Sequence, residues 1–139
     1  MSLPALLICL VVGISDGDTL TARCNDQTLK IRLAELDAPE KAQPFGARSK
    51  QRLSALCFQK QAEIRSQATD RYGRTVARVT CDGIDANTEQ VRSGMAWVYD
   101  KYVLDKSLSA VQGDAKAARR GLWSDAEAMP PWEWRSKGK

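Results

Sequence analysis

Acidic residues gather in two short stretches of the sequence that also carry turn-forming residues. The first is Asp16-Gly17-Asp18-Thr19, and the second runs from Arg32 to Glu40 and contains Asp37. Clustered carboxylates are the ligands that hard divalent cations prefer. The sequence contains no histidine, so the commonest general base and the usual nitrogen ligand for softer metals are missing.

Arginines accompany these acids. Arg32 opens the second stretch, and a third motif, Asp70-Arg71-Tyr72-Gly73-Arg74, adds two more beside a tyrosine. A guanidinium group binds phosphate oxygens through paired hydrogen bonds, and the formal net charge of +4 favours a polyanionic partner. Acids and arginines together therefore indicate metal-dependent phosphodiester chemistry.

The elements that must position these residues follow from the pattern of apolar residues and turns. We expect strands at 5–15, 19–24, 28–36, 61–67 and 75–81, and helices at 47–57, from 85 onward and at 107–120. The Asp16-Gly17 pair predicts the first hairpin turn. Five short strands with helices after the third and fifth indicate an α+β, mainly β fold, a five-stranded OB-fold barrel with three helices.

A chain of 139 residues suits one domain. We expect its core at about residues 5–123, with a tail, 124–139, that packs back on the barrel through its Trp and Pro residues. The apolar run from Leu3 to Ile14 is shorter than the roughly 20 residues that span a bilayer, so we interpret it as the first strand. We expect a monomer without membrane contact, whose export signal is not in this chain.

The chain contains four cysteines, Cys9, Cys24, Cys57 and Cys81, without C-x-x-C spacing. This pattern argues against a zinc site. If Asp16-Gly17 forms a two-residue turn, Cys9 lies directly opposite Cys24. If a second hairpin turns at Thr69-Asp70, Cys57 lies one position from the residue opposite Cys81.

Two cross-strand disulfides, Cys9–Cys24 and Cys57–Cys81, are therefore the prediction. They would place the protein in an oxidising compartment, either periplasmic or secreted. Four buried free thiols remain the alternative.

The motifs Asp-Gly-Asp-Thr, R-x-x-x-x-D-x-P-E and D-R-Y-G-R occur here in the order typical of the staphylococcal nuclease (thermonuclease) family, which the chain resembles from about Val11 to Trp123. The resemblance implies an OB barrel and a calcium-dependent endonuclease. Such an enzyme cleaves DNA and RNA with little sequence preference and leaves 3′-phosphate ends. We expect single strands to be the preferred substrate.

The resemblance also implies a ligand set for Ca²⁺. Asp18 and Asp37 would bind the ion through their carboxylates and Ala38 through its backbone carbonyl. Asp16 and Thr19 would support these ligands without touching the ion. For Asp16, a purely structural role in the turn is an equal alternative.

The remaining site residues act on water and substrate. By resemblance, Glu40 orients or deprotonates the attacking water, and Arg32 and Arg74 stabilise the charge on the phosphate. The substrate-binding residues implied are Arg71, Tyr72, Tyr99 and Tyr102. The connection from Glu40 to Pro44 is shorter than in the namesake enzyme, so substrate preference is expected to differ.

A different class of function competes with this one. OB folds often bind nucleic acid or protein without chemistry, so a non-catalytic binding module is the alternative. The sequence disfavours it because every expected catalytic position is filled, by Asp18, Arg32, Asp37, Glu40 and Arg74.

Overall fold

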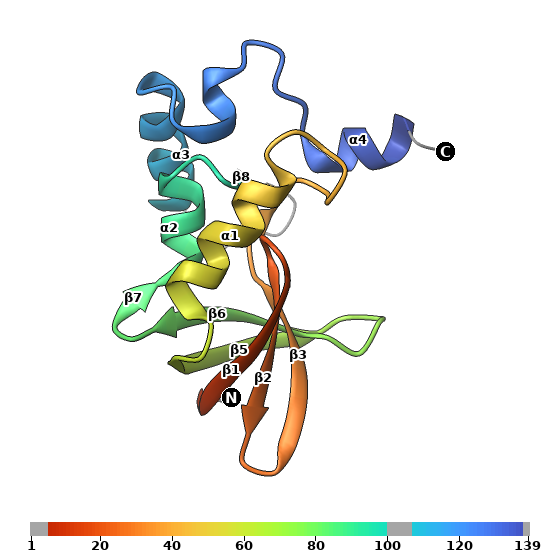
Figure 1. Cartoon of the computed structure of the whole chain (residues 1–139), viewed down its shortest axis with the longest axis vertical. Coiled ribbons are helices and arrows are strands. Elements are labelled where there is room, and N and C mark those ends of the chain that lie inside the picture. The colour runs from red at the N-terminus through yellow and green to blue at the C-terminus, as the bar shows by residue number, and fades with distance from the viewer. Residues whose placement is uncertain (1–5, 100–106, 138–139) are drawn as a thin grey trace.

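The computed structural model describes residues 6–99 and 107–137. Five long strands form the barrel: β1 (Leu6–Asp16), β2 (Thr19–Cys24), β3 (Gln27–Leu33), β5 (Gln61–Thr69) and β6 (Thr75–Cys81). They are hydrogen-bonded in the order β3-β2-β1-β5-β6, and a parallel pairing of β3 with β6 closes the sheet on itself. Figure 1 shows the strands crossing steeply below the helices. This is the expected mainly-β OB-type barrel.

Helices cover the upper end of the barrel (Figure 1). The helices are α1 (Gly46–Cys57), α2 (Ala86–Arg92), α3 (Ser107–Ala117), the 3₁₀ helix η2 (Gly121–Ser124) and α4 (Pro131–Lys137). The short strands are β4 (Leu36–Asp37), β7 (Ile84–Asp85) and β8 (Trp97–Val98). The described part of the chain thus has four α-helices where three were predicted, because the tail folds into α4. None of these helices is long and apolar enough to cross a membrane.

The core follows the alternation of the strands. On β1, Cys9 and Val11 point inward and are nearly inaccessible, whereas Ile8 and Leu10 point outward. Leu53 of α1 packs on the inward row of the barrel and is fully buried. An amphipathic helix therefore plugs the barrel end that carries the first acidic turn.

The third strand ends earlier than predicted. It was expected to reach residue 36 but ends at Leu33, because Glu35 adopts a left-handed φ of 70°. The buried Glu35 carboxylate accepts a hydrogen bond of 2.9 Å from Arg78. This bend redirects the chain, so that Leu36 and Asp37 pair with Val98 and Trp97 as β4 and β8.

The Cys9–Cys24 disulfide is confirmed, but the predicted turn was wrong by one residue. Asp16 is the last residue of β1 and pairs with Thr19, so that the turn consists of Gly17 and Asp18. Two irregularities of register in β1 compensate for this shift before the cysteines are reached.

The Cys57–Cys81 disulfide is also confirmed, for a different reason than the one predicted. The second hairpin turns around Tyr72 rather than at Thr69-Asp70, and Cys81 lies opposite Ala62. Cys57 is the last residue of α1, so this disulfide joins the helix to β6. Both disulfides together exclude the alternative of four free thiols.

Two glycines allow the segment after α2 and the start of η2 to come into contact. Gly94 and Gly121 both have positive φ values, of 72° and 53°. A Cβ atom on Gly94 would lie 2.1 Å from the carbonyl oxygen of Arg120, and one on Gly121 would lie 2.4 Å from the carbonyl oxygen of Gly94. The Leu122 N–H donates a 2.9 Å hydrogen bond to Gly94, so the two backbones are in direct contact.

Asn87 of α2 holds the bend after β3 against β6. Its Oδ1 accepts a hydrogen bond from the Val79 N–H at 2.9 Å, and its Nδ2 donates to the carbonyl of Ala34 at 3.0 Å. The side chain is fully buried. Water cannot replace these bonds when the amide is removed.

We therefore predict that Asn87→Ala lowers the free energy of unfolding by about 2–3 kcal/mol, because the Val79 and Ala34 backbone groups lose their buried partner. Urea denaturation with the disulfides intact measures the change. Gln51→Ala, which removes an exposed amide on α1, is the matched control. Equal stability of the two variants would contradict the role assigned to Asn87.

Candidate active site

The β1–β2 turn and the loop after β3 are joined through the Asp18 carboxylate. Asp18 is 6% exposed. Its Oδ2 accepts a hydrogen bond from the Ala38 N–H at 2.8 Å, and its Oδ1 accepts one from the Thr19 hydroxyl at 2.9 Å. Asp16 accepts a 3.1 Å bond from the Asp18 N–H. The two acidic stretches of the sequence are therefore one site.

The turn itself is held by residues that the sequence analysis did not identify. A Cβ on Gly17 would lie 1.8 Å from Ser49 Oγ, so only glycine fits where the turn meets α1. The buried Gln90 side chain of α2 donates to the Gly17 carbonyl at 2.7 Å and to the Ser49 carbonyl at 3.0 Å. The only sequence signal for these two hydrogen bonds was a glutamine that faces inward in the middle of a helix.

Arg32 lies between the two carboxylates. Its Nη2 is 3.3 Å from Asp37 Oδ1 and 3.5 Å from Asp18 Oδ2. Its Nη1 donates to the carbonyls of Leu33 and Leu36 at 2.8 and 2.9 Å, which fixes the plane of the guanidinium. Arg32 thus neutralises part of the acidic charge from one side of the pair.

The electrostatics of the acids differ strongly. Burial raises the pKa of Asp16 to about 7, and the neighbouring Asp18 charge adds to the effect. Burial also acts on Asp18, but the Arg32 charge and several hydrogen bonds lower its pKa overall. For Asp37 burial dominates and raises the pKa, despite a hydrogen bond from Arg135. The charge of Asp18 raises the pKa of both Asp16 and Asp37, and the charge of Arg32 acts in the opposite direction on both.

This donor set suits a hard cation. Within the described residues no group of three or more Asp, Glu or Cys side chains is arranged to hold a metal ion. An ion here would be held by Asp18, Asp37 and the backbone carbonyl of Ala38, with its other positions open to water and phosphate. An oxygen-only set with open positions fits Ca²⁺.

Glu40 lies at the edge of this corner, where a residue of the tail meets it. Arg135 of α4 donates from Nη1 to Glu40 Oε1 at 2.5 Å and from Nη2 to Asp37 Oδ2 at 2.6 Å. The tail was expected to contribute packing only. Nothing in the sequence marks Arg135, because its partners lie more than ninety residues earlier in the chain.

The third motif forms the tip of the β5–β6 hairpin. Arg74 Nε donates to Asp70 Oδ2 at 2.7 Å, and the guanidinium groups of Arg71 and Arg74 lie 5.0 and 5.4 Å from the ring centre of Tyr72. Tyr72 is 68% exposed. Val76 pairs with Arg32 in the barrel, which brings the hairpin near the acids, but within the described residues Arg74 does not contact them.

Of the two remaining tyrosines, the structure describes Tyr99. The Tyr99 ring lies edge-on to Trp132 of α4 at 5.3 Å, and its N–H donates to the Glu35 carbonyl at 3.0 Å. Tyr102 lies outside the described residues. Tyr99 therefore contributes to tail packing.

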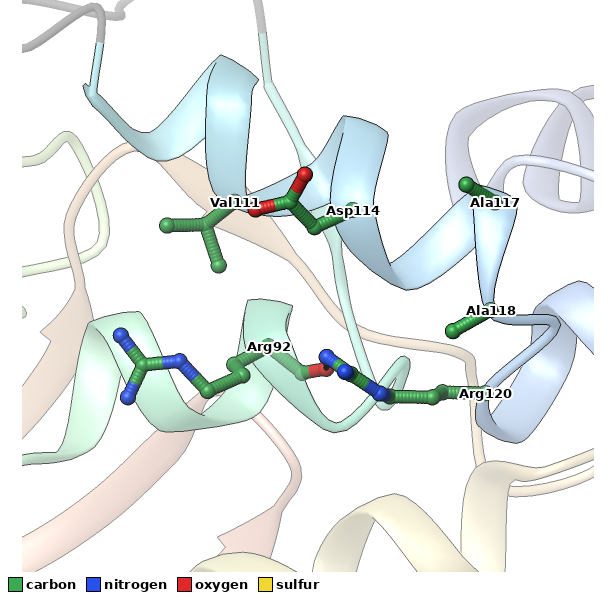
Figure 2. A pocket seen from close by; sticks show the side chains of 6 residues that line it. All are labelled: Arg92, Val111, Asp114, Ala117, Ala118 and Arg120. Atoms are coloured by element: carbon green, nitrogen blue, oxygen red, sulfur yellow. Dashed lines mark hydrogen bonds between the residues drawn. The ribbon is translucent and has the colours of Figure 1, made fainter.

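A separate hollow lies between α2 and α3 (Figure 2). Its lining residues are Arg92, Val111, Asp114, Ala117, Ala118 and Arg120. Figure 2 shows Val111 and Asp114 on α3, across the hollow from Arg92 and Arg120. None of the acids of the corner takes part in it, so it is not part of the site built by Asp18 and Asp37.

Comparison with known proteins assigns the chain to a family. A family model described as staphylococcal nuclease homologue matches residues 30–125. An "Uncharacterized endonuclease" of Haemophilus influenzae is 45% identical over 132 residues, covering 94% of this chain and 74% of the relative. A "Micrococcal nuclease" of Shigella flexneri is 39% identical over 140 residues, covering 93% and 80%.

A further "Uncharacterized endonuclease", of Escherichia coli O157:H7, is 41% identical over 128 residues, covering 91% of this chain and 84% of the relative. The matched range includes Arg32, Asp37, Glu40 and Arg74, which the barrel carries in and beside the acidic corner. By this match and by its OB-type barrel, the chain belongs to the staphylococcal nuclease family.

Proposed function

We propose that the protein is a Ca²⁺-dependent endonuclease that hydrolyses phosphodiester bonds of DNA and RNA and leaves 3′-phosphate ends. One observation carries the proposal: Asp18, Asp37 and Arg32 meet in a buried corner with Glu40 at its open edge. Family membership and the names of the relatives support nuclease activity.

The proposed roles follow from the contacts. Asp18, Asp37 and the Ala38 carbonyl would hold Ca²⁺, which when bound supplies positive charge to the phosphate oxygens. Glu40 is a half-buried carboxylate linked to Asp37 through Arg135, so it would take the proton of the attacking water. Arg32 would stabilise the charge that builds up on the phosphate.

The β5–β6 hairpin would supply the substrate-facing surface. Arg74 would bind the scissile phosphate together with Arg32, and Arg71 would bind a neighbouring phosphate. Tyr72 exposes a ring face on which any unstacked base can lie, which favours single strands and tolerates sequence. Tyr99 and Tyr102 remain proposed substrate neighbours on the strength of the resemblance.

The supporting residues and the compartment complete the proposal. Asp16 and Thr19 would keep Asp18 in place through the bonds described above. Two disulfides are stable in an oxidising environment, so we propose a periplasmic or secreted enzyme, acting as a monomer.

We predict that Ca²⁺ stimulates cleavage of plasmid DNA and of RNA and that a chelator abolishes it. Zn²⁺ is not expected to substitute, because the site offers only oxygen ligands. Asp18→Asn should abolish calcium binding in calorimetry, whereas Asp26→Asn, in an exposed turn, should not. Zn²⁺-supported turnover without a response to Ca²⁺ would refute the ligand assignment.

We predict that Glu40→Gln lowers kcat by about 100-fold or more while nucleic-acid binding is retained, because proton transfer acts in the transition state. Arg32→Ala should cost a comparable factor through lost charge stabilisation. Steady-state kinetics with end-group analysis measure both, and Glu63→Gln on the exposed face of β5 is the control. If both variants cleave normally, the roles assigned to Glu40 and Arg32 are wrong. If the wild type does not cleave, the binding-module alternative is the better function.

A further inference from the structure

The loop that carries Glu40 is tied to the C-terminal segment, residues 129–137, by a buried glutamine. The Glu40 N–H donates to Gln43 Oε1 at 3.1 Å, and Gln43 Nε2 donates to the Met129 carbonyl at 2.7 Å. Gln43 is 7% exposed. The backbone of Glu40 therefore depends on where the C-terminal segment lies.

Aromatic packing anchors the same segment beside Asp37. Trp132 lies edge-on to Trp97 with ring centres 5.9 Å apart, and Trp97 is the residue that pairs with Asp37 across β4 and β8. Pro131, at the start of α4, is buried. Figure 1 shows α4 next to the loop that leads into α1. These contacts place α4 against the strand that carries a proposed metal ligand.

Arg135 projects from this anchored helix onto both functional carboxylates. Its two terminal nitrogens contact Glu40 at 2.5 Å and Asp37 at 2.6 Å, so the planar group bridges them as a fork. The Arg135 side chain is 44% exposed and that of Glu40 38% exposed. Without this fork, the Glu40 side chain would keep several rotamers open to solvent.

We propose that the C-terminal segment completes the active site: Arg135 fixes the Glu40 carboxylate relative to Asp37, and Gln43 fixes its backbone. Arg135 is then a positioning residue that acts through Glu40. The inference rests on the proposed nuclease function. It assigns a catalytic need to a segment beyond the matched family range, which ends at residue 125.

The physical reason is the sensitivity of proton transfer to geometry. A base must reach the attacking water at hydrogen-bond distance, and a displacement of about 1 Å can cost 100-fold in rate. When a cation binds Asp37, Arg135 needs to keep only its contact with Glu40 in order to position that carboxylate. An inhibitory role would have the opposite consequence, because removal of Arg135 would then raise activity.

The experiment compares Arg135→Gln, Arg135→Lys and the control Lys137→Ala, which removes an exposed cation from the same helix. We expect Arg135→Gln to lower kcat by about tenfold or more with a small change in KM. Arg135→Lys should recover part of the loss, since it keeps the charge without the fork. Lys137→Ala should match the wild type. Wild-type or higher kcat in Arg135→Gln would overturn the inference.

A double variant separates positioning from direct substrate contact. In the Glu40→Gln background, Arg135→Gln should cause no further loss of kcat, because the group that it positions is already disabled. A further tenfold loss would refute positioning through Glu40. Calcium affinity, measured by calorimetry, should be unchanged or tighter in Arg135→Gln, since a competing charge leaves Asp37. Weaker calcium binding would also overturn the inference.

Failure of the function and failure of the inference give different results. If the wild-type protein does not cleave with Ca²⁺, the proposed function fails and the catalytic role of Arg135 fails with it. If the wild type cleaves and Arg135→Gln equals it, only the inference fails. A separate measurement in calcium-free protein tests the contact between Arg135 and Glu40. There the shifts in melting temperature caused by Arg135→Gln and by Glu40→Gln should be non-additive.

Discussion

The bond between the Asp18 carboxylate and the Ala38 N–H is the constraint on which the site depends. It joins a hairpin turn to a loop twenty residues later, in a place that is almost closed to solvent. A buried carboxylate without donors would be costly, so the two loops must approach for Asp18 to remain charged. The fold meets this need by closing the barrel through β3 and β6 and by clamping the turn with Gln90.

The same arrangement explains why acids can accumulate here. The pKa of Asp18 is lowered because the Arg32 charge and the donors of Ala38 and Thr19 outweigh its burial, whereas Asp16 and Asp37 bear the cost of burial as raised pKa values. The fold therefore holds Asp16 and Asp37 in a place that disfavours their charged forms. Such a state is typical of functional sites, where stability is given up for chemistry.

Much of the fold could be predicted because its signals are local. The strand alternation, the Asp-Gly pair and the amphipathic pattern of α1 each depend on neighbouring residues. The bend at Glu35 was missed because a left-handed glutamate has no sequence signature, and it is stabilised by Arg78 from another strand. The pairing of Cys57 was predicted correctly from a wrong register, since the helix end and β6 meet through tertiary packing.

For the site, Asp18, Arg32 and Asp37 were predicted and found together because two motifs carry them. Arg135, Gln43 and Gln90 could not be found, because each acts on a partner far away in the chain and is an ordinary polar residue in its own segment. Arg74, which the resemblance assigns to the phosphate, pairs with Asp70 at the hairpin tip. Local motifs name candidate residues, but tertiary contacts decide which of them meet.

The backbone contact between Gly94 and Gly121 makes the proposed active site sensitive to substitutions that lie outside it. The chain runs from this backbone contact toward α4, so the geometry of the contact sets the direction in which the chain continues. A Cβ atom at either glycine would collide with the facing backbone carbonyl and force the two segments apart. Substitution of either glycine would thus disturb the alignment of α4 at the proposed active site, although every residue of that site would be unchanged.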